Sequence, residues 1–190
     1  ELNSLGYKIF LDLKFHDITN TVIQSCVAAS ELGVWMLNIH SSSGKKTMVK
    51  SKINLVNNDY ATLLLGVTIL TSMDENDINE IGYKTDINAQ VLKMATLCYE
   101  SGLDGVVCSA EEAKSIKLKF PEKFICVCPG IRKKDEESND QKRIITPAVA
   151  AKNGADYIVV GRPIIKSRNP LESLISIKNE FDNGLKKNEK

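Results

Sequence analysis

The chain has 190 residues, of which 43% are hydrophobic and 26% are charged, a composition typical of one soluble domain that can bury a sizeable core. Lysine and arginine total 25 against 24 for aspartate and glutamate, so the net charge of +1 argues against nucleic acid or an anionic membrane as a partner. No apolar run has the length of a membrane span, and the first residues do not read as a secretion signal.

Two periodicities alternate along the chain, the period of two that is typical of strands and the period of 3.6 that is typical of helices. After a short helical end at residues 1–6, the pattern predicts six strands, each followed by a helix. The predicted strands span residues 8–13, 34–39, 61–70, 104–108, 124–128 and 157–160. The predicted helices span residues 20–32, 45–56, 89–101, 110–119, 146–153 and 171–185.

Apolar strands that alternate with helices predict an α/β fold with a parallel sheet. An open six-stranded Rossmann-type sheet is one arrangement, but the nucleotide-binding fingerprints GxGxxG and GxxxxGK[ST] are absent from the sequence. We therefore favour a (β/α)8 TIM barrel whose first two β/α units are missing, so that the chain runs from the third strand to the carboxyl-terminal helix. No low-complexity linker interrupts residues 1–190, which predicts a single domain.

The segment Phe10–Ile18 brings two carboxylates and an ammonium to the end of a predicted strand. Alternation along the strand places Asp12 and Lys14 on one face, and the carboxyl end of a parallel strand is where catalytic side chains collect. Unpaired charge is costly in apolar surroundings, so Asp12, Lys14 and Asp17 are expected to compensate one another. The apolar neighbours expected to be buried around them are Leu11, Leu13, Phe15 and Ile18. An ordinary ion pair on a surface strand is the alternative.

Other polar residues carry weaker signals. The five cysteines are odd in number and lack CxxC spacing, which favours reduced core thiols in a cytoplasmic protein over disulfides or a zinc site. His16 and His40 are too few to make a zinc site convincing. The acidic residues of the segment 74–80 predict a solvated loop, and the lysines of the segment 117–119 predict a solvated helix face.

The segment Asp12-Leu13-Lys14-Phe15-His16-Asp17-Ile18 resembles the D-x-K-x-x-D-I signature of the orotidine 5′-phosphate decarboxylase family. Further segments resemble the bacterial branch of that family, in the same order: Val67–Ser72, Gly102–Ser109, Pro129–Arg132, Asp140–Arg143 and Val159–Ile164. The resemblance covers nearly the whole chain. One departure is Thr19, which stands where the family commonly has proline.

The resemblance implies an enzyme that removes carbon dioxide from orotidine 5′-monophosphate to give UMP in pyrimidine biosynthesis, with neither metal nor organic cofactor. Lys14 matches the lysine that stabilises and protonates the ring carbanion. Asp12 matches the carboxylate beside the leaving group, and Asp17 matches an aspartate that reaches the neighbouring site of a homodimer. The implied substrate-binding residues are Asp12, Lys14, Asp17, Ile18, Thr21, Thr71, Ser72, Arg132, Gln141, Gly161 and Arg162.

These binding residues sort by the part of the ligand that they match. Arg162 and the backbone of Gly161 match the family's phosphate grip, and guanidinium geometry suits such a contact. Gln141 and Arg132 match a long loop that closes over the ligand. Thr71 and Ser72 match the residues that contact the pyrimidine edge. Thr21 matches the border of the ribose and phosphate.

Two other functions stay open. One is a metal-dependent sugar-phosphate decarboxylase or epimerase of the same barrel superfamily, which uses a similar D-x-K-x-x-D strand. The other is a non-catalytic nucleotide-binding remnant. The resemblance places the first lysine of a Lys-Asp-Lys-Asp network on the missing strands, so we expect this stretch of chain to be inactive by itself.

Overall fold

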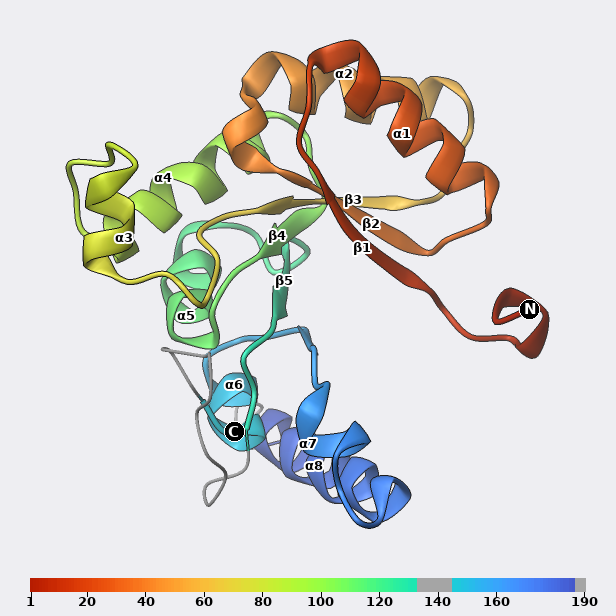
Figure 1. Cartoon of the computed structure of the whole chain (residues 1–190), viewed down its shortest axis with the longest axis vertical. Helices are drawn as coiled ribbons and strands as arrows, with labels where there is room; N and C mark the ends of the chain where they lie inside the picture. The colour runs from red at the N-terminus through yellow and green to blue at the C-terminus, as the bar shows by residue number, and fades with distance from the viewer. Residues whose placement is uncertain (133–144, 187–190) are drawn as a thin grey trace. The chain divides into compact units, whose positions relative to one another are not determined.

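The structure of the chain, a computed structural model, describes residues 1–132 and 145–186 (Figure 1). The chain divides into two compact units, the first made of Glu1–Thr68 and Lys93–Val107 and the second of Ile69–Leu92 and Cys108–Lys190. Each unit is described below by itself, and the expected single domain stays a prediction. None of the helices in the described part of the chain combines the length and hydropathy that a membrane crossing requires.

The described residues of the first unit form a parallel sheet whose strands pair in chain order. The strands are β1 (Phe10–Phe15), β2 (Met36–His40), β3 (Leu63–Val67) and β4 (Gly105–Val107). The helical segments are η1 (Asn3–Leu5), α1 (Thr19–Glu31), η2 (Ser41–Ser43), α2 (Lys45–Asn57) and, from Lys93 on, the second half of α4 (Ile87–Glu100). Figure 1 shows α1 and α2 side by side over one face of this sheet.

The core of the first unit is apolar and tightly packed. The side chains of Leu37, Ile39 and Leu65 are fully buried. Gly66 lies in β3 at a point where an added Cβ would come within 2.2 Å of the Cys98 sulfur, so only a residue without a side chain lets α4 pack this closely.

All five cysteines of the chain are free and buried, as the sequence predicts for core thiols. Burial raises the pKa of the Cys26 and Cys98 thiols to about 12. These two thiols are therefore protonated at neutral pH and behave as small apolar side chains.

The second unit has a parallel pair of strands, β5 (Ile125–Cys128) and β6 (Tyr157–Ile158), among its described residues. Its helices are α3 (Glu75–Glu80), α5 (Ala110–Lys119), α6 (Pro147–Lys152), α7 (Arg162–Ile165), α8 (Pro170–Leu185) and the first half of α4. Helices α6 and α8 pack together (Figure 1), and Gly184 permits the close approach, because an added Cβ would lie 2.7 Å from the Ala148 carbonyl oxygen.

One turn recurs where a helix leads into a strand. Gly33, Gly102 and Gly154 have φ values of 72°, 77° and 90°, a left-handed conformation that favours glycine, and each follows the last turn of a helix. The residue two positions later starts the approach to the next strand. These residues are Trp35, Asp104 and Asp156.

In the first unit, the Asp104 side chain connects the turn before β4 to α2 and β3. Its Oδ2 accepts a hydrogen bond from the Lys52 ammonium on α2 at 2.6 Å and another from the backbone N–H of Leu64 on β3 at 2.7 Å. Trp35 replaces the acid in the turn before β2, and the Lys8 ammonium lies 5.3 Å from the centroid of its ring. A cation–π contact therefore stands where the other turns have an ion pair.

In the second unit, Asp156 makes the same arrangement. Its Oδ2 accepts from the Lys117 ammonium on α5 at 2.7 Å and from the backbone N–H of Cys126 on β5 at 2.6 Å. Lys117 also donates to the carbonyl oxygens of Glu122 and Phe124, and its side chain is only 17% exposed. The prediction that Lys117 lies on a solvated helix face is therefore wrong.

Most predicted elements are confirmed within two or three residues at each end, and two segments differ. The stretch 74–80, predicted as a loop, contains α3, because the Asp74 carboxylate caps the backbone N–H groups of Asn76 and Asp77. The Asp77 carboxylate in turn accepts a hydrogen bond from the backbone N–H of Asp74. The short helix α7, which has Pro163 in its first turn, was not predicted.

Candidate active site

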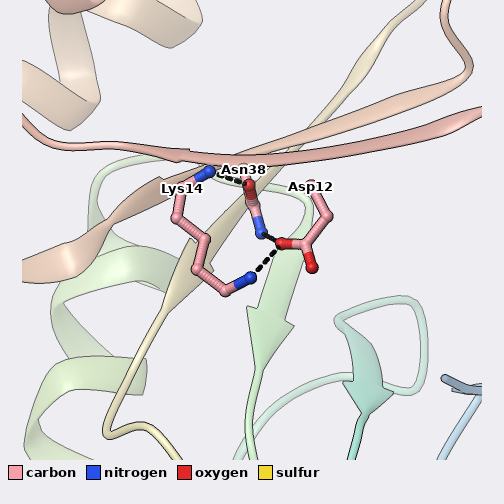
Figure 2. A network of polar contacts seen from close by, with 3 residues as sticks. All are labelled: Asp12, Lys14 and Asn38. Carbon is pink, nitrogen blue, oxygen red and sulfur yellow. Dashed lines mark hydrogen bonds and ion pairs between the residues drawn. The ribbon is translucent and has the colours of Figure 1, made fainter. Parts of the chain in front are cut away.

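The predicted pairing of Asp12 with Lys14 is present at the carboxyl end of β1. The Lys14 ammonium lies 2.7 Å from Asp12 Oδ1, and the two side chains are 36% and 40% exposed (Figure 2). The expected burial of their apolar neighbours is wrong in part, since Leu13 is 58% and Ile18 is 74% exposed. Among the described residues, β1 pairs with β2.

Asn38 on β2 completes this group, and the sequence reasoning missed it. Its side-chain amide donates from Nδ2 to Asp12 Oδ1 at 2.6 Å and accepts at Oδ1 from the backbone N–H of Lys14 at 2.8 Å (Figure 2). The available signal was a single amide inside the otherwise apolar run Met36-Leu37-Asn38-Ile39. A buried amide requires hydrogen-bond partners, and on this sheet the partners are the predicted catalytic residues.

The backbone of β1 departs from a regular strand at Lys14. This residue has φ 50°, and it is one of two non-glycine residues in the described segments with a positive φ. The pairing register jumps here, because Leu11 stands opposite Leu37 but Phe15 stands opposite Ile39. Four steps along β1 thus match two along β2, which makes an irregular bulge that carries both charged side chains.

Two imidazoles lie next to this bulge. The ring centroids of His16 and His40 are 5.1 Å apart with a tilt of 32°. The pKa of His40 is lowered from its ordinary value, first by burial and then by the positive charges of His16 and Lys14, while Asp12 acts in the opposite direction. His40 is therefore neutral at physiological pH.

The predicted partner Asp17 is placed differently from Asp12. Its carboxylate accepts a hydrogen bond from the backbone N–H of Ile18 at 2.6 Å, at the start of α1. Of the three charges expected to compensate one another, only Asp12 and Lys14 form an ion pair among the described residues. Asp17 instead accepts its hydrogen bond from the backbone. The side chains of Asp17, Ile18 and Thr21 are exposed.

The other predicted binding residues belong to the second unit. Thr71 is buried and Ser72 is exposed, just beyond the end of β3. Arg132 is 5% exposed, and its guanidinium donates to the carbonyl oxygen of Ile131 at 2.8 Å.

Two further predicted residues begin α7. Gly161 is exposed and precedes the helix, and an added Cβ there would meet open space. Arg162 is the first residue of α7 and is partly buried. Gln141 lies outside the described residues.

Comparison with known proteins decides the family. Residues 1–177 match the family model described as "Orotidine 5'-phosphate decarboxylase / HUMPS family". The chain belongs to this family. The resemblance inferred from the D-x-K-x-x-D-I segment is thereby confirmed.

Similar members of the orotidine 5′-phosphate decarboxylase family come from bacteria. An orotidine 5′-phosphate decarboxylase of Chromobacterium violaceum is 46% identical over 180 residues, covering 95% of this chain and 73% of that protein. The corresponding protein of Coxiella burnetii is 48% identical over 180 residues, covering 93% of this chain and 76% of that protein. The crystal structure of orotidine 5′-phosphate decarboxylase from Lactobacillus acidophilus matches with a TM-score of 0.81 and 37% identity, covering 95% of this chain and 78% of that chain.

Membership of the family fixes the fold class and the type of enzyme. The parallel strands of both units, with the match to the Lactobacillus structure, confirm the α/β fold of the TIM-barrel class. The chain spans about three quarters of the length of these relatives, between 73% and 78%. The predicted enzyme class, a carboxy-lyase, agrees with the relatives' names and is confirmed.

Proposed function

We propose that the protein containing this chain converts orotidine 5′-monophosphate to UMP and carbon dioxide, without a metal or an organic cofactor. The observation that supports this most directly is the Lys14 ammonium held 2.7 Å from the Asp12 carboxylate. Family membership supplies the substrate class, and the pair supplies a chemistry that suits it. As a protein of pyrimidine biosynthesis with five free, buried thiols, it belongs in a reducing compartment, and we propose the cytoplasm.

In this proposal Lys14 stabilises the negative charge that develops during the reaction. When the bond to the carboxylate breaks, its electron pair stays on the ring carbon, and negative charge develops there. An ammonium fixed next to that carbon stabilises the charge without the reorganisation that water would need. The same ammonium then gives a proton to the carbon, so Lys14 leaves the step neutral and is reprotonated from solvent.

Asp12 serves two purposes in this proposal. Its Oδ1 holds the ammonium at 2.7 Å, which sets the position of the proton donor. Its negative charge lies near the substrate carboxylate and raises the energy of the ground state relative to a transition state in which that charge is leaving.

The remaining residues would bind the ligand. Arg162 and the backbone of Gly161 suit the phosphate, because a guanidinium gives two parallel donors and the space at Gly161 is open. Thr71 and Ser72 would contact the pyrimidine edge, Thr21 would border the ribose, and Arg132 would approach with the loop that carries Gln141.

A homodimer is the proposed assembly. Asp17 and Ile18 are exposed beside β1, and their exposure suits a contact with a second copy of the chain. In that assembly Asp17 would leave its backbone contact and complete the charge network of the partner's site.

A metal-dependent sugar-phosphate decarboxylase or epimerase is the second candidate, because the matching family description joins the decarboxylases with HUMPS. Such an enzyme would lose activity on treatment with EDTA. A non-catalytic nucleotide-binding protein is the third, and it would be stabilised thermally by UMP while leaving orotidine 5′-monophosphate unconsumed.

The test is an absorbance assay of decarboxylation on the protein that contains this chain at its natural length, with and without EDTA. We expect turnover that is insensitive to EDTA, and a loss of about 10³-fold or more in Lys14→Ala with UMP binding retained. Lys45→Ala is the matched control, because Lys45 also pairs with a carboxylate, Glu100, at 2.8 Å, but both side chains are 52% exposed.

Equal rates for the wild type and Lys14→Ala would remove Lys14 from the proposed role. Loss of turnover in EDTA would favour the metal-dependent candidate instead.

A further inference from the structure

Asn38 is an unusual residue for its position. It lies in the middle of β2 and is 0% exposed, and its sequence neighbours Leu37 and Ile39 are buried as well. Burial of an amide without partners costs a few kcal/mol, roughly 1–3 on the scale of protein mutations. The role of this buried amide therefore depends on the groups that it binds.

Both ends of the Asn38 amide bind the group that carries the proposed chemistry. The donor end contacts Asp12 Oδ1 at 2.6 Å, and the acceptor end contacts the Lys14 backbone N–H at 2.8 Å. Asp12 Oδ1 therefore receives two donors, the Asn38 amide and the Lys14 ammonium (Figure 2). One side chain thus fixes the carboxylate and the backbone from which the ammonium extends.

The contact to Lys14 also replaces a lost sheet contact. The register jump between Leu11 and Phe15 takes Lys14 out of the regular pairing with β2, so its N–H needs another acceptor. Its φ of 50° lies in the left-handed region, which is unfavourable for an L-residue. The Asn38 carbonyl supplies the acceptor that stabilises this conformation.

We propose that Asn38 is a positioning residue, which holds the Asp12 carboxylate and the left-handed backbone of Lys14 so that the ammonium stays at one place. The inference rests on the proposed function for its kinetic consequence, and on the structure alone for its geometric one. Asn38 does not touch the reacting atoms in this arrangement; it acts through Asp12 and Lys14.

Two substitutions separate the two ends of the amide. Asn38→Leu keeps the branching at Cγ and the number of side-chain heavy atoms but removes both the donor and the acceptor. Asn38→Asp keeps an acceptor for the Lys14 N–H and puts a second carboxylate against Asp12. When the introduced carboxyl group is protonated, it can donate a hydrogen bond to Asp12. The turnover of Asn38→Asp should therefore rise as the pH falls. The other titratable groups close to Asp12 are Lys14, His16 and His40.

Thr62→Val is the matched control for the loss of a buried hydrogen bond. Thr62 is 6% exposed, belongs to the same unit, and donates to the Val34 carbonyl oxygen at 3.0 Å near the amino end of β3. It is buried and polar like Asn38, but it has no part in the proposed chemistry.

The first readout is hydrogen exchange of the Lys14 amide, followed by NMR on protein labelled with ¹⁵N-lysine and assigned with Lys14→Arg. We expect exchange about tenfold faster in Asn38→Leu, since one hydrogen bond is lost, and little change in Asn38→Asp or Thr62→Val. This readout needs no substrate.

The second readout is the kinetics of decarboxylation. In Asn38→Leu we expect kcat to fall about 10²-fold, as for a catalytic group displaced by about 1 Å, with KM changed less than about threefold. Thr62→Val should keep kcat within about twofold. In Asn38→Asp, kcat should rise as the pH is lowered, whereas the wild type and Thr62→Val should not show this rise.

The proposal is overturned if Lys14 amide exchange and kcat in Asn38→Leu match those of Thr62→Val. If Asn38→Leu does not fold, the pH profile of the isosteric Asn38→Asp decides, and a profile parallel to that of the wild type would overturn it. If the wild type does not decarboxylate orotidine 5′-monophosphate, the proposed function fails, while the exchange of the Lys14 amide still decides whether Asn38 positions it.

Discussion

The two ends of the sheet in the first unit each carry a lysine–aspartate pair, and the pairs have nearly the same length. At the carboxyl end of β1, Lys14 and Asp12 are 2.7 Å apart, and before β4 Lys52 and Asp104 are 2.6 Å apart. The pairs differ in exposure, 36% and 40% against 21% and 24%, and in what else the carboxylate holds. Distance therefore does not tell the proposed catalytic pair from a structural one.

The second partner of each carboxylate makes the distinction. Asp104 accepts from the backbone of Leu64, so the pair joins helix α2 to two neighbouring strands. Asp12 accepts from the Asn38 side chain, and the side chain of Lys14 is 36% exposed. This agrees with the division of barrel folds into a stabilising amino-terminal face and a reactive carboxyl-terminal one.

The comparison predicts opposite outcomes for one substitution made at the two ends. Lys14→Met should lower turnover by about 10³-fold or more, because the developing charge loses its ammonium. Its free energy of unfolding should change by less than about 1 kcal/mol, since the pair is well exposed. Lys52→Met should leave turnover per folded molecule unchanged and lower the free energy of unfolding by about 2 kcal/mol, because Asp104 stays partly buried without its cation.

Urea unfolding and the absorbance assay, run on both variants, measure these effects. The distinction between the two ends fails if Lys14→Met is the less stable variant or if Lys52→Met loses turnover to a similar degree.

The sequence predicted the Asp12–Lys14 pair but not the Lys52–Asp104 pair. The D-x-K spacing of Asp12 and Lys14 lies within one strand, where alternation fixes the geometry. Lys52 and Asp104 are 52 residues apart, and nothing in the sequence pattern joins them before the strands are aligned. Asn38 was missed for the same reason, because its role depends on the register between β1 and β2.

Burial was the least predictable property of the site. Leu13 and Ile18 are apolar, and apolar character alone predicted that they would be covered. Their exposure of 58% and 74% reflects which surfaces meet them, which one strand's pattern does not contain. Likewise the acidic character of Asp74 and Asp77 predicted solvation, but short carboxylates also cap helices.

The second unit contains another structural lysine–aspartate pair, Lys117 and Asp156. Lys117 binds Asp156 and two backbone carbonyl oxygens, and its side chain is 17% exposed. Lys117→Met should therefore lower the free energy of unfolding by about 3 kcal/mol, more than Lys52→Met does. Thermal or urea unfolding measures it, with Lys114→Met on the exposed side of α5 as control. Equal stability of these two variants would mean that the contacts of Lys117 contribute nothing net.

A substitution of Asp104 separates the contribution of its charge from that of its hydrogen bond to the backbone. Its effect on stability should be smaller. Asp104→Asn keeps an oxygen that can accept from the Leu64 N–H but loses the attraction to Lys52. We expect a loss of about 1 kcal/mol in the free energy of unfolding, below that of Lys52→Met, because no uncompensated carboxylate is left behind. A loss as large as that of Lys52→Met would show that the charge, not the backbone contact, dominates.

The smallest effect concerns the pH dependence of stability near the proposed catalytic pair. The pKa of His40 is lower in the folded chain than its ordinary value of 6.5, mainly through burial. As the pH falls below 6.5, the unfolded chain binds a proton that the folded chain does not, so stability is lost down to the lower folded pKa. Unfolding curves at several pH values should show this loss, and His40→Gln should reduce it. An unchanged slope in His40→Gln would assign the dependence to other groups.

Trp35 gives the chain a built-in optical probe. It is the one tryptophan in the sequence, and it lies at the amino end of β2 with the Lys8 ammonium over its ring. Its fluorescence emission therefore follows the loosening of the stabilising end of the first unit, and a lysine so close to the indole makes the signal sensitive to their separation. Ligand titrations at the opposite end can be run against this emission as an internal baseline.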